Sequence, residues 1–364
     1  MANDSGFTLT DAGYYGRQGV KFGLVLLVVL MVGRVVLTAA VSYYRAVHPP
    51  APPPPTMGFG VLPSIVFPSQ TAEQKPSAYQ LELPTGRFPA FPDRAKVLLK
   101  VKTSPSLLAD QRAKEVAANY GFVLEPTVLS SRIYRWTKSE PLQAALEMDT
   151  QNQHFSLRTD FLSRPELLAQ RNLPTDAEAV EVAKTFLSTG VDLPQDMATA
   201  SGKVSYLKAL GGELAPAVSL SDADFLQVDL QRTPIDGQLP MYTPEGTKGI
   251  FSAVIAGSRS TREQVMRAEF RYQPVDYTQV HTYPLRSPAA AWQVLQSGEG
   301  YVAQKGSLPT AVVRDVYLGY FDNTEEEEYL QPIYIFAGDG GFLGYVTAVD
   351  PQLIQVGGSA AAAQ

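Results

Sequence analysis

Few side chains in this sequence are grouped in a way that supports chemistry. The 364 residues contain no cysteine and only three histidines, His48, His154 and His281. The lack of cysteine excludes disulfides, thiol nucleophiles, zinc–thiolate sites and iron–sulfur clusters. The sequence has no HExxH, GxSxG or Walker motif, and no GxGxxG follows a strand-like run. We therefore predict a protein that is not an enzyme and that needs no cofactor.

The histidines are far from one another in the sequence, which argues against a shared site. His154 ends the polar turn Asp149–His154, so we expect a solvated hairpin residue. His281 lies near the junction of two blocks of predicted structure, and we expect it in a linker.

The densest acidic run is Asp322–Glu328, with the sequence DNTEEEE. Carboxylates at this density could bind Ca²⁺, but the run lacks the spaced Asp, Asn and Gly of a calcium loop. Because it lies between two strand-like runs, a solvated hairpin loop is the favoured interpretation. Asp339, in the sequence Gly338–Gly341, is interpreted as a turn former.

Aromatic residues are abundant on the strand-like runs, and Tyr317, Tyr320 and Tyr334 are examples. Packing in the core and across strands explains most of them. The alternative is an exposed aromatic groove that binds a peptide or a glycan. The formal net charge is −6 with no basic block, which argues against a nucleic-acid partner.

The most distinctive segment is the apolar run Phe22–Tyr44. It is long enough to cross a bilayer as one helix, which takes about 20 residues. A cleaved signal peptide is the alternative, with Thr38–Ala40 as the small-residue cleavage site. We favour an uncleaved anchor, because the apolar run resumes after Arg34. Arg17 and Lys21 precede it, and this charge bias predicts a cytoplasmic N-terminus and an extracytoplasmic C-terminal domain.

Arg34 lies near the middle of this run, where a charge costs roughly 2.5–3.5 kcal/mol to insert. Snorkelling of the side chain is one interpretation, and contact with a second membrane protein is the other. Gly19 and Gly23 form a GxxxG pattern, and Gly23, Leu30, Arg34 and Leu37 fall near one helix face. We therefore single out Gly19, Gly23 and Arg34 as candidate partner-binding residues.

Beyond the membrane segment, the sequence predicts an α+β fold of three tandem units, each a helix followed by antiparallel strands. The run Met57–Pro68, broken by Gly and Pro, is expected to lie extended along a domain surface. The expected division of the chain is a cytoplasmic tail (1–18), a transmembrane helix (19–45), a proline-rich linker (46–76), three α+β units (77–172, 173–284 and 285–356) and a disordered tail (357–364).

The helices of the three units are expected at Leu107–Tyr120, after Thr175, and after Ser287. Thr175 and Glu178 have capping-box spacing, and Ser287-Pro288 is typical of a helix start. The strands of the third unit are expected at Ala311–Phe321, Leu330–Ala337 and Phe342–Val349.

The third unit resembles the C-terminal domain of the YycH/YycI regulatory proteins, whose domains are similar to PepSY units. The resemblance is carried by the segments Ser287–Trp292, Leu295–Gly298, Val313–Tyr320, Leu330–Phe336 and Gly344–Ala348. It implies a non-enzymatic single-pass protein that contacts a membrane sensor kinase, partly through its transmembrane helix. This chain departs from the family in its proline-rich spacer and its additional helix–sheet unit.

From the sequence we therefore expect a membrane-anchored, extracytoplasmic regulatory or scaffold protein. A structural component of the cell envelope is the second hypothesis, and an enzyme acting on cell-wall material is the third. The last would require a deep pocket lined by carboxylates, whose positions in space the sequence does not supply.

Overall fold

The computed structural model describes residues 9–47, 54–164, 172–257 and 264–355. By its internal contacts the chain divides into two compact units, residues 1–54 and residues 55–364. Each unit is described by itself below. The expected tail at 357–364 lies outside the described residues.

The first unit is a single helix, α1 (Leu9–Val47). Residues Gly13–Tyr44 within it are long and apolar enough to span a membrane, and none of that stretch is covered by other parts of the chain. The helix begins well before the expected start at residue 19, so residues 9–18 of the expected tail are helical. No proline interrupts the segment, so every backbone N–H that the helix needs is available along its whole length.

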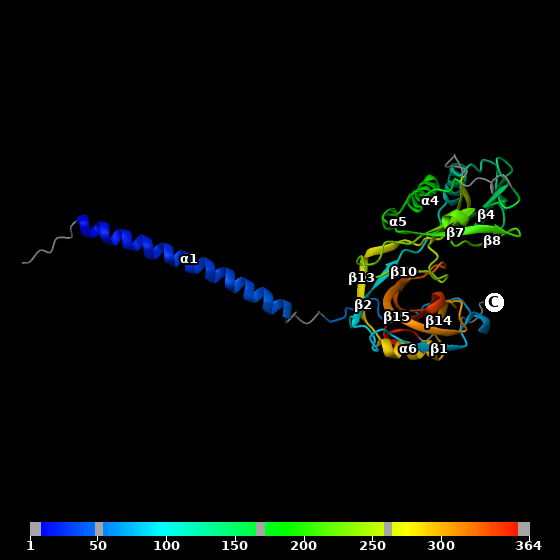
Figure 1. The fold of residues 1–364 in the computed structure, drawn as a ribbon. Helices are drawn as coiled ribbons and strands as arrows, with labels where there is room; N and C mark the ends of the chain where they lie inside the picture. The colour runs from blue at the N-terminus through cyan, green and yellow to red at the C-terminus, as the bar shows by residue number, and fades with distance from the viewer. Residues whose placement is uncertain (1–8, 48–53, 165–171, 258–263, 356–364) are drawn as a thin grey trace, which may run out of the picture. The chain divides into compact units, whose positions relative to one another are not determined.

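The described residues of the second unit form two sheets, whose strands are drawn as arrows in Figure 1. The larger of these sheets has nine strands. Its strands, in spatial order, are β3 (Thr127–Val128), β4 (Ile133–Lys138), β5 (Ala144–Asp149), β6 (Phe155–Thr159), β12 (Val265–Phe270), β11 (Phe251–Ala256), β9 (Phe225–Leu230), β7 (Gly202–Leu210) and β8 (Glu213–Pro216). All neighbours are antiparallel, and β6 joins β12 with Leu157 opposite Ala268. The strands of the first and second expected units therefore meet at this β6–β12 seam.

Helices α2 (Ala109–Asn119) and α4 (Asp176–Gly190) pack on this sheet and on each other. The expected capping box starts α4, since the Thr175 hydroxyl accepts from the Glu178 backbone N–H while Glu178 accepts from Thr175 N. The short helix α5 (Gln195–Ala198) follows α4. Alternate residues of β5 are buried, which is the period-2 pattern of a strand with one covered face.

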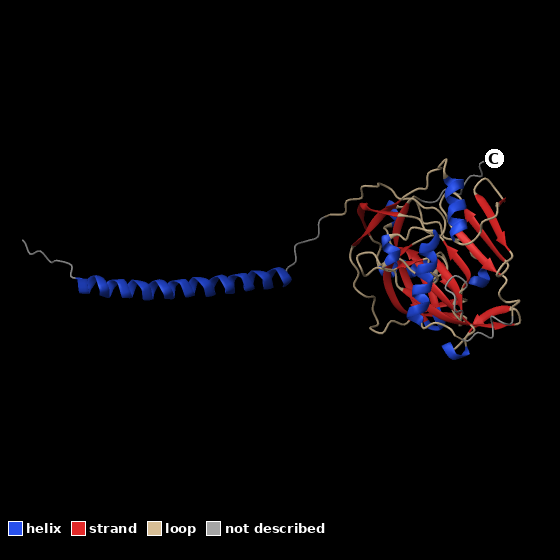
Figure 2. Ribbon diagram, turned by 90° about the horizontal axis from the view of Figure 1, so that it is seen from above, coloured by secondary structure: helices blue, strands red, loops and turns tan. Residues whose placement is uncertain are grey.

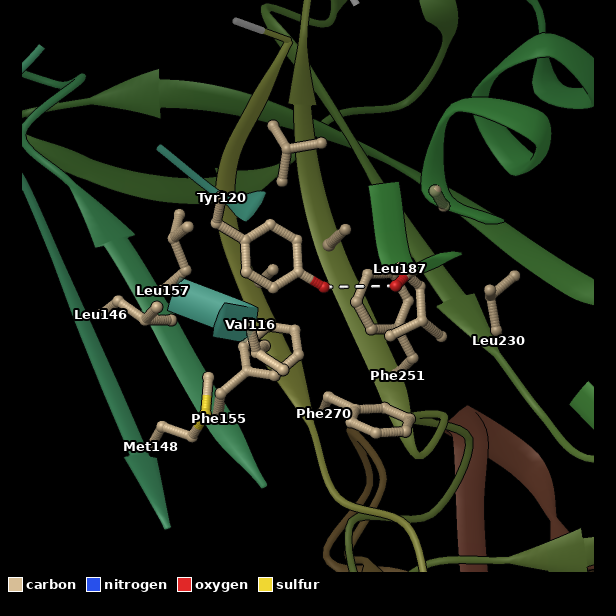
Figure 3. Close-up of a cluster of buried hydrophobic side chains, with 14 of the residues drawn as sticks. Val116, Tyr120, Leu146, Met148, Phe155, Leu157, Leu187, Leu230, Phe251 and Phe270 are labelled. Carbon is tan, nitrogen blue, oxygen red and sulfur yellow. Dashed lines mark hydrogen bonds between the residues drawn. The ribbon is translucent and has the colours of Figure 1, made fainter. Parts of the chain in front are cut away.

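Aromatic rings fill the core between these helices and the sheet (Figure 3). Tyr120, just after α2, stacks on Phe186 of α4 with ring centroids 4.7 Å apart. Its hydroxyl donates to the Leu187 carbonyl at 3.2 Å, so it links the two helices across the core. Gly190 must be glycine, because a Cβ there would lie 2.3 Å from the Tyr120 ring.

The second sheet has eight strands. They are β1 (Ala78–Leu81), β2 (Arg94–Lys100), β10 (Met241–Tyr242), β13 (Val275–Pro284), β14 (Tyr301–Gln304), β15 (Thr310–Phe321), β16 (Tyr329–Gly338) and β17 (Phe342–Thr347). The meander β15–β16–β17 is its centre, while β1 and β10 add to β15 as parallel strands. Strand β13 pairs along β2, which in turn reaches the start of β16.

Helix α6 (Pro288–Gln296) packs on the eight-stranded sheet, and the Ser287 hydroxyl caps it by accepting from Ala290 N. Ala291 and Leu295 form its buried face against β17 and its neighbours. The expected turn at Gly338–Gly341 is present, and Gly340 and Gly341 adopt positive φ values of 66° and 82° that favour glycine. Asp339 in this turn accepts two hydrogen bonds from Arg314.

Residues 56–77 form what we call the strap, an extended segment bound along the eight-stranded sheet. Its hydrogen bonds join Met57 N to Thr282 O, Leu62 N to Leu353 O, Tyr283 Oη to Gly60 O, Gln331 Nε2 to Pro63 O, Gln70 Nε2 to Val302 O and Lys75 Nζ to Gly298 O. Leu62 is completely buried. The expectation that Met57–Pro68 lies extended along a domain surface is confirmed.

The α+β class is confirmed, and the three expected helices are present as α2, α4 and α6. Three separate sheets are not what the structure shows, because the strands belong to two sheets. The physical reason is that β6 and β12 each end a meander, and pairing them satisfies two edges that would otherwise carry free backbone groups. Figure 2 shows the strands of this unit with few helices among them.

Candidate functional site

The three residues singled out by sequence, Gly19, Gly23 and Arg34, all lie on α1. A Cβ built on either glycine would meet no other atom, so this part of the helix is open to close approach by a partner. The Arg34 side chain is exposed, and the Thr38 hydroxyl donates to the Arg34 carbonyl one turn earlier at 2.9 Å. Within the apolar run Phe22–Tyr44, Arg34 is therefore the one charged residue.

Two of the histidine expectations need correction. His154 is in the expected β5–β6 hairpin but is partly buried, with Nε2 2.9 Å from the Tyr272 carbonyl oxygen. Burial lowers the pKa of His154. His281 is a residue of strand β13 rather than of a linker, and its ring packs edge-on against Phe59 of the strap. His48 lies outside the described residues.

The acidic run Asp322–Glu328 connects β15 and β16 as expected, but it is not uniformly solvated. Glu325 and Glu326 are exposed, whereas Asp322 and Asn323 are buried. Within the described ranges, no cluster of three or more His, Asp or Glu side chains is placed to hold a metal ion. Asp322 instead belongs to a network of charged groups buried between the two sheets.

This joint network, as we call it, consists of Lys100, Asp196, Arg232 and Asp322. Arg232, which follows β9, donates from Nη2 to Asp196 at 2.6 Å and from Nη1 to Asp322 at 3.2 Å. Lys100, at the end of β2, donates to the second oxygen of Asp322 at 2.9 Å. Two cations and two carboxylates therefore alternate in a chain that links the nine-stranded sheet to the eight-stranded sheet.

Tyrosine hydroxyls complete the shell of Asp196. Tyr272 Oη donates to one carboxylate oxygen at 3.1 Å and Tyr277 Oη to the other at 2.9 Å. The Arg232 guanidinium also lies over the Tyr272 ring, 4.6 Å from its centroid. Burial raises the pKa of Tyr277 to about 12, so both hydroxyls remain donors at neutral pH.

The charged states of the network residues are stabilised by the oppositely charged groups beside them. Burial alone would raise the pKa of Asp322, but the charges of Lys100 and Arg232 outweigh that effect and hold the pKa below its usual value. Arg232 is fully buried and keeps its charge because Asp322 and Asp196 raise its pKa against the effect of burial. A charge removed from this chain would leave its partner buried and uncompensated.

Two grooves lie beside the joint network. The loop groove, about 450 Å³, contains Arg132, Asp149, His154, Arg271 and the exposed part of the acidic run. The strand groove, also about 450 Å³, contains Asp196 and Tyr277 together with residues of β2 and β13. Most charged groups in the loop groove are already in ion pairs, including Asp149 with Arg132 and Glu269 with Arg271. In the strand groove, Asp196 and Asp236 are both in ion pairs, whereas Glu325 and Glu326 of the loop groove are neighbours on one exposed loop.

A third cavity, the helix–sheet pocket, has a volume of about 520 Å³ and a mainly apolar lining. It lies between the end of α2, one side of α4, and strands β5, β6 and β12. Tyr120 and Phe186 form part of its wall, and Leu157 and Met266 form part of its apolar surface. Its size is in the range of small-molecule sites, about 300–1,000 Å³.

Sequence reasoning identified α1 but missed the joint network and the helix–sheet pocket. The four charged residues of the network are 36 to 222 positions apart along the chain for the pairs that bond. Asp322 begins the acidic run noted in the sequence, but no motif connects it to Lys100, Asp196 or Arg232. The pocket is equally hidden, since its residues are those that any helix and strand use to pack.

Comparison with known proteins does not name a family. No protein-family model and no curated protein matches this chain. Among solved structures, an uncharacterized protein from Eubacterium rectale is similar over 70% of this chain and 82% of that chain, with 10% identity and a TM-score of 0.33. A TM-score this low supports no conclusion about fold or function. The resemblance to the YycH/YycI proteins therefore stays an interpretation of the residues alone.

The joint network predicts a large stability effect for Arg232→Met. The change leaves Asp196 and Asp322 buried without their shared cation, so the free energy of unfolding should fall by about 3–5 kcal/mol. Urea denaturation of the fragment Pro55–Gln364, followed by circular dichroism, measures the loss. The control is Arg135→Met, which removes an exposed pair with Glu147 and should cost about 1 kcal/mol or less. Equal losses in the two variants would contradict a buried network.

Glu327 predicts a pH dependence of stability near neutrality. It is largely buried and accepts from Asn323 Nδ2 at 3.0 Å, and burial raises its pKa to about 7. Because the folded pKa exceeds that of the unfolded chain, this stabilisation is complete below the unfolded pKa and is lost as the pH rises through about 7.

We therefore expect the free energy of unfolding to fall by about 1–3 kcal/mol between about pH 5 and pH 7.5. Glu327→Gln should flatten this dependence, while Glu325→Gln, which changes an exposed side chain of the same loop, should preserve it. Asp322, with its lowered pKa, acts at more acidic pH and in the opposite direction. An unchanged slope in Glu327→Gln would disprove the assignment.

Proposed function

We propose that this chain is a single-pass, membrane-anchored regulatory protein that binds a membrane partner through α1 and carries a non-enzymatic domain outside the cytoplasm. The observation that carries the proposal is the uncovered apolar surface of α1 with Arg34 exposed on it. A charge in the hydrocarbon region is costly unless it faces protein or reaches the interface. A partner that supplies a carboxylate or backbone carbonyls would offset that cost.

The resemblance of the third block to the YycH/YycI proteins supports a sensor kinase as the class of partner. The order of one helix followed by antiparallel strands recurs with α2, α4 and α6, which supports three related units, the first two fused at the β6–β12 seam. A scaffold role in the cell envelope is the alternative function, and it would use the same anchor and the same sheets.

The strap supports a role in which movement of the anchor helix α1 would be transmitted to the second unit. Thr56, at its start, exchanges hydrogen bonds with Thr282, from Thr56 N to the Thr282 hydroxyl and from Thr282 N to the Thr56 hydroxyl. The chain is therefore fixed to β13 within a few residues of its first described residue after α1. The expected proline-rich linker (46–76) is therefore bound to the domain from residue 56 onward, and a segment bound in this way constrains position more than a flexible linker does.

The orientation is tested by labelling a single introduced cysteine. The native sequence has no cysteine, so Ser104→Cys, at an exposed position, gives one reactive thiol. We expect a membrane-impermeant maleimide to label this variant in intact cells to the same extent as in lysed cells. A matched Ser5→Cys variant, ahead of α1, should be labelled only after lysis. The reverse pattern would place the domain in the cytoplasm.

Partner binding is tested with a photo-crosslinking residue at Leu37, on the same predicted face as Arg34. Arg34→Leu should weaken crosslinking to membrane proteins about threefold to twentyfold, in line with the energies of polar contacts between membrane helices. Arg34→Lys keeps the charge and should retain more crosslinking, and Met31→Leu is the neutral control. If Arg34→Leu crosslinks as strongly as the native chain, α1 is an anchor and nothing more.

A further inference from the structure

The helix–sheet pocket has a mainly apolar inner surface, and hydrogen bonding and ring stacking hold part of its wall in place. Its inner surface comes from strands β5, β6 and β12 and from α4. Leu157, Val182, Phe186 and Met266 are among the apolar residues. Tyr120 is held in its wall by the hydrogen bond to Leu187 (Figure 3). It also stacks on Phe186. Because its wall is fixed by these contacts, the pocket has a defined volume without a ligand.

The rim of the pocket is polar but has no excess charge. Lys138 and Glu140 are its charged residues, one of each sign, and Asn119, Thr159, Thr185 and Thr189 supply amide and hydroxyl groups. Lys138 Nζ donates to the Tyr120 carbonyl, 3.3 Å away, at the end of α2, and lies over the Phe122 ring. An anionic ligand would gain little here, because the carboxylate of Glu140 and the carbonyl end of α2 oppose it.

The floor of the pocket also argues against an extended peptide. Strands β5, β6 and β12 are internal strands of the nine-stranded sheet, each paired on both sides. Their backbone groups are therefore already in ladder hydrogen bonds, and a peptide could not add to them as a strand. A ligand can therefore contact the apolar side chains on the floor of the pocket and the hydroxyl groups at its mouth.

We propose that the helix–sheet pocket binds an uncharged single-chain amphiphile, with its hydrocarbon chain on the apolar floor and its neutral polar end at the threonine-lined mouth. The volume accommodates roughly 20 non-hydrogen atoms at the density of protein interiors, which is the size of a monoacylglycerol. A chain anchored in a bilayer has a supply of such molecules close by. The inference goes beyond the partner contact of α1, because it concerns a site in the other unit of the chain.

The experiment uses the fragment Pro55–Gln364, which is a compact unit and contains every buried hydrophobic cluster of the described residues. The neutral probe N-phenyl-1-naphthylamine is titrated into it and followed by fluorescence. We expect saturable binding, displacement by monomyristoylglycerol, and at least about tenfold weaker displacement by myristate, whose carboxylate must be desolvated without a free cation.

Two variants locate the binding. Thr185 is exposed at the mouth on α4, so Thr185→Trp should fill the entrance without disturbing the core and weaken probe binding at least about tenfold. Ser188→Trp places the same ring on an exposed position of α4 outside the lining and should bind as the native fragment does. Thr189→Trp, one turn further along the mouth, is the second blocking variant. Thermal unfolding by circular dichroism confirms that each variant folds.

Three results would overturn the proposal. They are the absence of saturable probe binding to the native fragment, undiminished binding by folded Thr185→Trp and Thr189→Trp, and displacement by myristate or by a neutral leucine-rich peptide at least as strong as by monomyristoylglycerol. None of these results depends on α1, which the fragment lacks. Failure of the membrane-partner proposal and failure of this one are therefore distinguishable.

Discussion

The ion pair between Arg232 and Asp322 is the contact on which the arrangement of the second unit depends. Arg232 follows a strand of the nine-stranded sheet and Asp322 follows a strand of the eight-stranded sheet, and both are almost completely buried. A buried ion pair is not more stabilising than apolar packing of the same volume. We interpret its value as specificity: apolar surfaces can slide over one another, whereas Arg232 must reach Asp196 and Asp322 together. One arrangement of the two sheets satisfies every charge.

The same region explains why strands from distant parts of the chain meet. Gln273, between β12 and β13, donates to the carbonyls of Val101 and Glu327 and accepts from Glu327 N. One amide side chain thereby satisfies backbone groups from the end of β2 and from the acidic run. Buried backbone groups must find partners, and short irregular segments find them in side chains. The acidic run is consequently buried at Asp322 and Asn323, while Glu325, Glu326 and Glu328 are exposed.

Local features of this protein follow from its sequence, while long-range features do not. The capping box at Thr175, the Ser287-Pro288 helix start and the glycine turn after β16 depend on neighbouring residues, and each was predictable. The fusion of two meanders at β6–β12 depends on which edges meet in space, and hydrophobic alternation is the same for a paired edge and a free one. Strand β13 was missed because its alternation is weak, with Tyr277, Thr278 and Gln279 all exposed. The joint network and the helix–sheet pocket form only when segments far apart in the sequence pack together. No local sequence pattern therefore predicts them.

A continuous set of contacts connects the strap to the joint network. The strap bonds to β13 at Thr282, and β13 carries Tyr277, whose hydroxyl donates to Asp196. Contacts of this kind do not by themselves transmit a signal, because coupling requires an element with two arrangements. The joint network argues for a single arrangement, since every one of its four charges is paired in place. Within the second unit, the paired charges therefore favour one packing of the two sheets. A hinge between the two sheets would have to separate these buried charges, which is costly in the protein interior.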